Sequence, residues 1–359
     1  MATVPVENIF YLLSYAWNLL DEMEDVRVEA EQLPSSADLL ARLLITGTSR
    51  LLRRGIDQGY LPKTEVLNTI RGRVDFSASY RRLLFHQARV QCDFEEFLPD
   101  VLHNRILRSV LASLASCKDL ASAQRSDLGS LLRRMEGITP LRITHAHFHQ
   151  VRLHRNNAHY RLLMNLCELV WENVLVNEQS GEVTFRDFMR DPHQMARLFE
   201  SFVAKFYKKH SGWRVSAQER IRWDTPTPHE LLPEMRADVV LRSEERVLLV
   251  ECKFYGETLQ EGPWGGVPKL HSSHLYQVST YLQHMAATSP DQGLVGLLLY
   301  PTVGVGLREN LILSGKQIRV RTIDLSRSWS EVEAQMANNL PDAFNVDFKF
   351  EPISNNLNG

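Results

Sequence analysis

The most informative segment of this 359-residue chain lies in its second half and reads Ala237-Asp-Val-Val-Leu-Arg-Ser-Glu-Glu-Arg-Val-Leu-Leu-Val-Glu-Cys-Lys-Phe254. Two apolar runs, 239–241 and 247–250, flank a polar break, and this pattern predicts a β-hairpin. Side chains alternate along a strand, so Glu251 and Lys253 are expected on one face and the Cys252 side chain on the other. Pairing of the two strands would bring Asp238 beside Glu251.

Two carboxylates at the end of a buried strand offer the oxygen ligands that a hard cation such as Mg²⁺ prefers. Buried charges without partners are costly, and a metal ion would remove that cost. Such a site is what metal-assisted hydrolysis of a phosphodiester requires. The alternative is a solvated hairpin in which Lys253 only forms an ion pair with Asp238. The apolar run 247–250 leads straight into the charged residues and favours the metal site.

Composition restricts the class of protein. A formal net charge of −2, with 44% hydrophobic and 23% charged residues, is typical of a soluble globular protein. Any DNA contact must therefore come from a local basic surface or from a partner. The four scattered cysteines favour a reducing, cytoplasmic location. No apolar run is long enough to indicate a membrane span. The sequence contains no Walker phosphate-binding motif, so this chain is not expected to hydrolyse nucleotides by itself.

The length predicts two domains. Residues 1–176 are expected to form a mixed helical and β N-terminal domain, with a strand-rich segment at about 55–100. Residues 177–350 alternate helix, hairpin, strand and helix, which predicts a mixed sheet flanked by helices, of α/β (α+β) class. The polar stretch at 177–182 is the expected linker, and residues 351–359 are expected to be a disordered tail.

Three further residues are candidates for the same site. Glu200 lies on a predicted helix, 194–210, and is a candidate to hold a second metal or a metal-bound water. Gln277 and Tyr281 are four residues apart on the next predicted helix and so share a face. They are candidates to position Lys253 or a DNA phosphate. The alternatives are a surface carboxylate for Glu200 and plain helix packing for Tyr281.

Three alternating histidines, His145, His147 and His149, lie within 143–153, a segment expected to be a strand. One strand face lined by histidines suggests a zinc site. The spacing matches no common catalytic motif, and no carboxylate or cysteine stands nearby in the sequence. A solvated strand face is therefore the favoured interpretation.

The Asp238…Glu251-x-Lys253 pattern, with Glu200 before it and Gln277-x-x-x-Tyr281 after it, resembles the core of PD-(D/E)xK nucleases of the RecB type. Ala237 replaces the proline of that motif. With segments elsewhere, the chain resembles the McrC family, the nuclease subunits of McrBC modification-dependent restriction systems, over nearly its whole length. These segments are Val6-Glu-Asn-Ile-Phe-Tyr-Leu-Leu-Ser-Tyr-Ala-Trp17, Ile70-Arg-Gly-Arg-Val-Asp-Phe76, His103-Asn-Arg-Ile-Leu-Arg-Ser109 and Leu275-Tyr-Gln277.

The resemblance implies a PD-(D/E)xK endonuclease domain in residues 177–350. Asp238, Glu251 and the backbone carbonyl of Cys252 would bind Mg²⁺. Lys253 would orient or activate the attacking water and stabilise charge on the phosphate. Some family members carry aspartate at the position of Glu251, and the fold accepts either residue.

The resemblance also implies a partner, an AAA+ ring of the McrB type that hydrolyses GTP and reads the methylated base, 5-methylcytosine. The substrate would be double-stranded DNA, and GTP would be bound by the ring rather than by this chain. The N-terminal domain would stimulate the ring through a projection, for which 55–100 is the candidate. Arg71 and Arg73 are possible contacts there, with core packing or solvation as their alternatives.

Two other functions remain open on the same residues. One is a stand-alone structure-selective or recombination nuclease, which would cut DNA without a partner. The other is a catalytically silent scaffold that only activates an NTPase ring. The intact set of Asp238, Glu251 and Lys253 argues against the scaffold.

Overall fold

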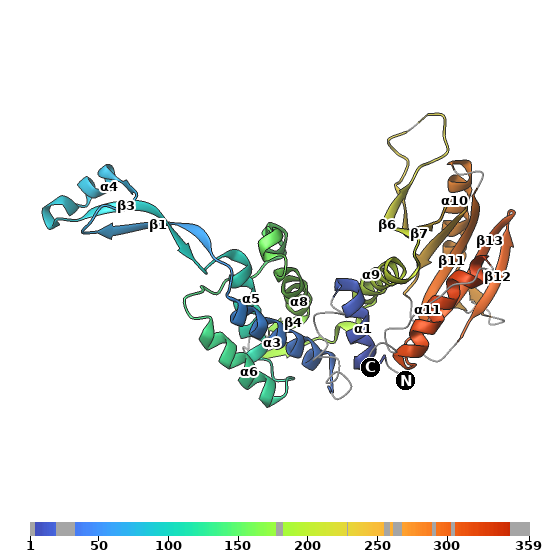
Figure 1. Ribbon diagram of the computed structural model, residues 1–359, viewed down its shortest axis with the longest axis horizontal. Helices are drawn as coiled ribbons and strands as arrows, with labels where there is room; N and C mark the ends of the chain where they lie inside the picture. Colours follow the sequence, from blue (N-terminus) through green and yellow to red (C-terminus); the bar gives the residue numbers. More distant parts are fainter. Residues whose placement is uncertain are drawn as a thin grey trace. The chain divides into compact units, whose positions relative to one another are not determined.

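The computed structural model describes residues 4–18, 33–176, 182–227, 229–254, 259–260, 268–288, 292–302 and 306–344 (Figure 1). The chain divides into two compact units, Met1–Ser36 with Asp187–Gly359, and Ala37–Arg186. No helix among the described residues is long and apolar enough to cross a membrane. The expected tail, 351–359, and residues 177–181 of the expected linker lie outside the described residues.

A six-stranded mixed sheet organises the first unit, in the order β12-β13-β11-β8-β7-β6. Strand β11 runs parallel to β8 and β13, and the other neighbours pair antiparallel. Strands β7, β8 and β11 are buried along most of their lengths, as expected for central strands that are covered on both faces. The strands are β6 (Arg214–Ile221), β7 (Met235–Arg242), β8 (Arg246–Cys252), β11 (Gly293–Thr302), β12 (Arg308–Leu313) and β13 (Lys316–Asp324), with a separate pair β9 (Leu259–Gln260) and β10 (Lys269–Leu270).

One side of this sheet packs against helix α10. Val278 and Leu282 of the helix are fully buried in a core that includes Leu249 and Leu298. Gly296 of β11 permits the close approach, because a Cβ at this position would lie 2.6 Å from Val278 Cγ1. The helices of this unit are α1 (Val6–Trp17), η3 (Phe188–Arg190), α9 (Pro192–His210), α10 (Ser272–Thr288) and α11 (Trp329–Phe344).

The two units do not follow the expected domain division at residue 176. Helix α1 belongs to the unit that contains the sheet, because it packs on α9 and α11. Tyr11 stacks on Trp329 with ring centroids 4.5 Å apart. The Tyr15 hydroxyl donates a 2.9 Å hydrogen bond to Glu333 Oε1. Sequence position placed this helix in the N-terminal domain, but burial of its aromatic face places it with the sheet.

Helices form most of the second unit, with α5 packed on α6 and α8. Asn104 of α5 donates 2.8 Å hydrogen bonds to the carbonyls of Asp57 and Pro99. The buried Tyr160 hydroxyl donates to Asn104 Oδ1 at 2.7 Å. These hydrogen bonds hold Asp57 and Pro99, which flank residues 59–98, next to helix α5. The elements are α3 (Ser36–Arg54), α5 (Leu102–Ala115), α6 (Ser122–Arg134), α7 (His145–Gln150), η2 (Arg155–Asn157), α8 (Tyr160–Asn173), β4 (Val174–Val176) and β5 (Val183–Phe185).

Residues 59–98 form a projection that extends away from α5, α6 and α8 (Figure 1). Its sheet has the order β1-β3-β2, and β1 and β3 pair antiparallel throughout. Residues 66–76 comprise the end of β1, a turn and β2, and Gly72 at φ 67° lies in that turn, directly before β2. The elements are β1 (Gly59–Leu67), β2 (Arg73–Val74), α4 (Phe76–Arg81), η1 (Leu84–Gln87) and β3 (Val90–Leu98).

The expectation of a strand at 143–153 was wrong, since helix α7 occupies its centre. His147 Nδ1 accepts a 3.0 Å hydrogen bond from the backbone N–H of Thr144. This local contact between a side chain and the backbone stabilises the start of a helix. The prediction of a strand relied on the short alternation of apolar and polar residues, which does not take this hydrogen bond into account.

Candidate active site

The hairpin of β7 and β8 brings Asp238 and Glu251 together. Val239 pairs with Val250, so the next positions outward are Asp238 and Glu251. The backbone N–H of Asp238 donates to Glu251 Oε1 at 3.3 Å, and that of Cys252 donates to Asp238 Oδ2 at 2.9 Å. The backbone of each strand thus holds the carboxylate of the other.

Lys253 completes this group directly after β8. Its Nζ donates a 3.0 Å hydrogen bond to Glu251 Oε2. Its backbone N–H donates to the Leu299 carbonyl of β11 at 2.9 Å, which fixes the residue at the end of central strand β8. The side chain is only 14% exposed and that of Glu251 is 0% exposed, so solvent screens this ion pair weakly.

Burial dominates the electrostatics of the carboxylates. It raises the pKa of Glu251 to about 7, with a further contribution from the neighbouring Asp238 charge. Burial also raises the pKa of Asp238. For Lys253, burial opposes the charged form, but the Glu251 and Asp238 carboxylates outweigh it and the net pKa is raised. The buried Glu251 carboxylate and the part-buried Asp238 carboxylate share one ammonium, and this excess negative charge suits a cation.

Glu200 of α9 lies close enough to interact electrostatically with Asp238. Burial and the Asp238 charge raise its pKa to about 7. Gln218 of β6 connects the two, since its Nε2 donates to Asp238 Oδ1 at 3.2 Å and to Glu200 Oε2 at 3.4 Å. Glu200 therefore belongs to the same acidic group as Asp238.

Sequence reasoning missed Gln218. It lies between residues of β6 that pair with Val239 and Ala237, which places it opposite Asp238. Its φ of 50° is in the left-handed region, which is unfavourable for a residue other than glycine. Strain of this kind concentrates at functional sites. A glutamine in an alternating strand carries no sequence signal for this role.

Gln277 and Tyr281 lie near each other on α10. Gln277 Nε2 donates a 3.1 Å hydrogen bond to the Tyr281 hydroxyl. Tyr281 is partly buried against the core between α10 and the sheet. Among the described residues, no hydrogen bond joins either side chain to Asp238, Glu251 or Lys253. Gln277 and Tyr281 are therefore in contact with each other, and their contact with Lys253 stays a prediction.

His274 of α10 is a second residue that sequence reasoning missed. Its Nδ1 is 2.9 Å from the Tyr300 hydroxyl of β11, and both side chains are buried. Burial, with a smaller effect of the nearby Lys253 charge, lowers the His274 pKa to about 4. A neutral imidazole next to the lysine adds no further positive charge.

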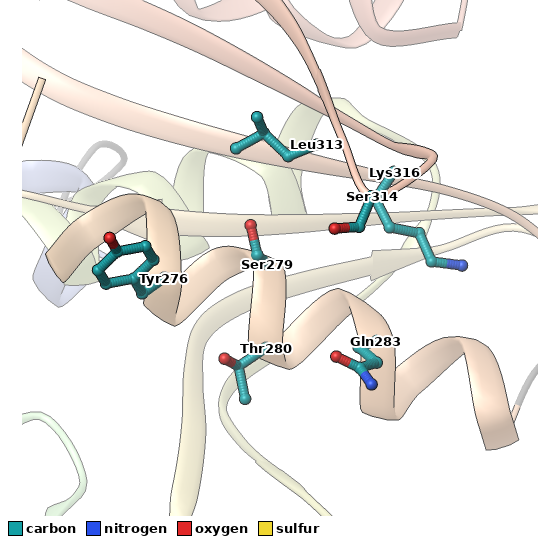
Figure 2. Close-up of a pocket in the computed structure, with 7 residues that line it drawn as sticks. All are labelled: Tyr276, Ser279, Thr280, Gln283, Leu313, Ser314 and Lys316. Atoms are coloured by element: carbon teal, nitrogen blue, oxygen red, sulfur yellow. The ribbon is translucent and has the colours of Figure 1, made fainter. Parts of the chain in front are cut away.

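A separate pocket of about 550 Å³ lies between α10 and the turn from β12 to β13. Figure 2 shows the Ser279 side chain of the helix pointing toward Leu313, at the end of β12. No carboxylate lines it, so it differs in chemistry from the Asp238 site. The lining residues are Tyr276, Ser279, Thr280, Gln283, Leu313, Ser314 and Lys316.

A family described as McrBC 5-methylcytosine restriction system component matches residues 6–301 of the chain. The chain belongs to this family. The resemblance to McrC inferred from the motifs is therefore confirmed, and the family match covers both the site on β7 and β8 and the projection. As an McrBC family member, the chain is a component of a 5-methylcytosine restriction system.

Individual relatives agree with the McrBC assignment. The chain is 30% identical over 339 residues to the type IV methyl-directed restriction enzyme EcoKMcrBC of Escherichia coli (strain K12), which covers 93% of this chain and 96% of that protein. Its fold is similar to a solved structure described as a half-complex from a tetradecameric assembly of Thermococcus gammatolerans McrB AAA+ hexamers with bound McrC. The TM-score is 0.58 at 17% identity, over 94% of this chain and 76% of that one. At this identity the likeness supports the mixed α/β fold alone.

Proposed function

We propose that this McrBC family member is the metal-dependent endonuclease subunit of its restriction system, built on the PD-(D/E)xK fold. The observation that carries the proposal is the group of Asp238, Glu251 and Lys253, in which the fully buried Glu251 near the end of β8 lies beside the part-buried Asp238 of β7 and the part-buried Lys253. The substrate is double-stranded DNA, and the chemistry is hydrolysis of a phosphodiester.

The donor set fits Mg²⁺. Asp238 and Glu251 supply carboxylate oxygens on the adjacent strands β7 and β8, and the single charge of Lys253 compensates them only in part. The Cys252 backbone carbonyl is the expected third ligand, and Glu200 is the candidate for a second metal or a bound water. When bound, Mg²⁺ would act as a Lewis acid on the scissile phosphate.

The residues of the chain do the remaining work. Lys253, whose Nζ lies 3.0 Å from Glu251 Oε2, stabilises negative charge on the phosphate and orients or activates the attacking water. The amide of Gln218 holds the Asp238 carboxylate against rotation. Gln277 and Tyr281 remain candidates for contact with a DNA phosphate.

We also propose that residues 59–98 bind an AAA+ GTPase ring of the McrB type. Seven of the exposed large hydrophobic side chains lie on this projection, which is the composition of a surface that a partner covers. Arg71 is already bound to Glu96 at 3.3 Å and lies over the Phe94 ring, so Arg73 is the better candidate contact. The exposed side chains are Tyr60, Ile70, Phe76, Tyr80, Leu83, Phe85 and Phe97.

The test separates cleavage from partner activation. Glu251→Ala should abolish cleavage of methylated DNA by the assembled complex, while the stimulation of GTP hydrolysis by the ring is unchanged. Glu245→Ala is the matched control, because this exposed carboxylate lies in the turn of the same hairpin. Retention of cleavage by Glu251→Ala would refute the assigned site.

The rivals predict different outcomes in the same assay. A stand-alone nuclease would cut DNA with Mg²⁺ in the absence of ring and GTP. A silent scaffold would stimulate GTP hydrolysis with no Mg²⁺-dependent cleavage by the wild-type chain. We expect cleavage only when the ring and GTP are both present.

A further inference from the structure

The histidine-rich segment at 145–149 takes no part in the nuclease site. Helix α7 places His145 and His149 four residues apart, on one helical face. Their ring centroids are 4.9 Å apart. His147 differs from them because its Nδ1 accepts the hydrogen bond from Thr144 at the start of the helix. Two imidazoles are therefore presented together on one side of α7.

Helix α8 supplies the carboxylates that the sequence alone did not reveal. Glu168 and Glu172 are also four residues apart, and each offers an oxygen within 4.8 Å of the other and of a His145 ring nitrogen. The distance from His145 Nδ1 to Glu168 Oε1 is 3.4 Å. Donors of a tetrahedral zinc site, with bonds of about 2.0–2.1 Å, lie about 3.4 Å from one another. The His145–Glu168 pair has this spacing, and the other pairs lie within 4.8 Å.

The structure of α7 gives an independent reason for a link to α8. It has six residues and buries none of them. A helix of this length is unstable without tertiary contacts. Its aromatic support is Trp171 of α8, whose ring centroid lies 5.6 Å from Phe148 and 6.1 Å from His145. A metal shared between the two helices would fix α7 beside that ring.

We propose that His145, Glu168 and Glu172 bind a divalent transition metal of the zinc class. Nitrogen and carboxylate donors of this kind suit zinc better than Mg²⁺, which prefers oxygen alone. The site lies in the unit Ala37–Arg186 and is separate from the nuclease carboxylates in the other unit. Its role is structural, as a cross-link between α7 and α8.

The experiment measures zinc binding by the full chain that carries Asp238→Asn and Glu251→Gln, so that the nuclease site does not contribute. After removal of metals by chelation, isothermal titration should show one zinc ion per chain. His145→Ala and Glu168→Gln should each weaken the affinity at least about tenfold, as loss of a ligand requires. His86→Ala is the control, since this exposed histidine lies on the projection of the same unit.

Thermal unfolding distinguishes a metal site from a simple ion pair. Zinc should raise the melting temperature of the parent chain and of the His86→Ala variant, but not that of His145→Ala. Circular dichroism of each variant in chelator checks that it is folded. Equal zinc affinity in the parent and in both ligand variants would overturn the proposal. So would a His145→Ala variant that is less stable in chelator yet binds zinc as the parent does.

Discussion

Gln218 lies opposite Asp238 in the sheet and donates a 3.2 Å hydrogen bond to its carboxylate, although its own φ is 50°. We predict that Gln218→Ala and Gln218→Gly both slow cleavage at least about tenfold, because the carboxylate loses its orientation. Gln218→Gly should be about 1 kcal/mol more stable than Gln218→Ala, because glycine adopts a left-handed backbone without strain. Single-turnover cleavage and urea unfolding measure the two effects.

Ser216→Gly is the control for this prediction, since Ser216 lies on the same strand without a positive φ. It should lower stability slightly and leave cleavage unchanged. Cleavage at the parent rate by Gln218→Gly would show that the amide has no positioning role.

The buried carboxylates predict an unusual dependence of stability on pH. The pKa of Glu251 in the folded state is raised to about 7. The protonated Glu251 carboxyl therefore stabilises the folded state. This contribution is complete below the pKa of about 4.3 that Glu251 has in the unfolded state, and it is lost as the pH rises through about 7. In metal-free buffer, Glu251→Gln should therefore be about 1–3 kcal/mol more stable than the parent at pH 8, with the difference vanishing near pH 4.

Thermal unfolding across this pH range, with chelator, measures the effect. Addition of Mg²⁺ at pH 8 should stabilise the parent but not the variant, because the ion replaces the missing positive charge. Parallel stability curves for parent and variant would contradict the burial of a charged Glu251.

Close contact between β11 and α10 predicts a strong effect at Gly296. A Cβ at this position would meet Val278 at 2.6 Å and Leu282 at 2.9 Å. Gly296→Ala should destabilise the sheet unit by about 1–3 kcal/mol through overpacking. Gly293→Ala, in the same strand, is the matched control because its Cβ would meet nothing closer than 3.7 Å. Equal melting temperatures for the two variants would refute the packing argument.

Exposed aromatic side chains on the projection predict a loss of partner activation. Tyr80→Ala should reduce the stimulation of GTP hydrolysis about tenfold or more, because a buried interface aromatic contributes over 1 kcal/mol. Ile312→Ala is the control, since Ile312 lies on edge strand β12 with 73% exposure, against 74% for Tyr80. DNA cleavage by the complex should likewise fall more with Tyr80→Ala than with Ile312→Ala. An equal effect of both variants would argue against the projection as the binding surface.

The sequence predicted the hairpin and its acidic pair because both follow from local rules. Alternation and a polar turn define β7 and β8, and strand pairing then places Asp238 by Glu251 without reference to the rest of the chain. A mixed sheet flanked by helices likewise follows from the order of helices and strands.

What the sequence did not predict depends on contacts between distant segments. Gln218 acquires its role from the register of β6 against β7, and His274 from the approach of α10 to β11. The helix at α7 was missed because one hydrogen bond between Thr144 and His147 outweighs a short alternating pattern. No local pattern carries this information.

The packing of α1 also has a consequence for the order of events during synthesis. Asn8 Nδ2 donates to the Leu325 carbonyl, 317 residues along the chain, and Tyr15 reaches Glu333 at a separation of 318. A ribosome adds about 5–20 residues per second. The apolar face of the first helix therefore waits many seconds for its partners, while the unit Ala37–Arg186 emerges complete between them. Assembly of the sheet unit is thereby postponed until the residues up to Glu333 have been synthesised.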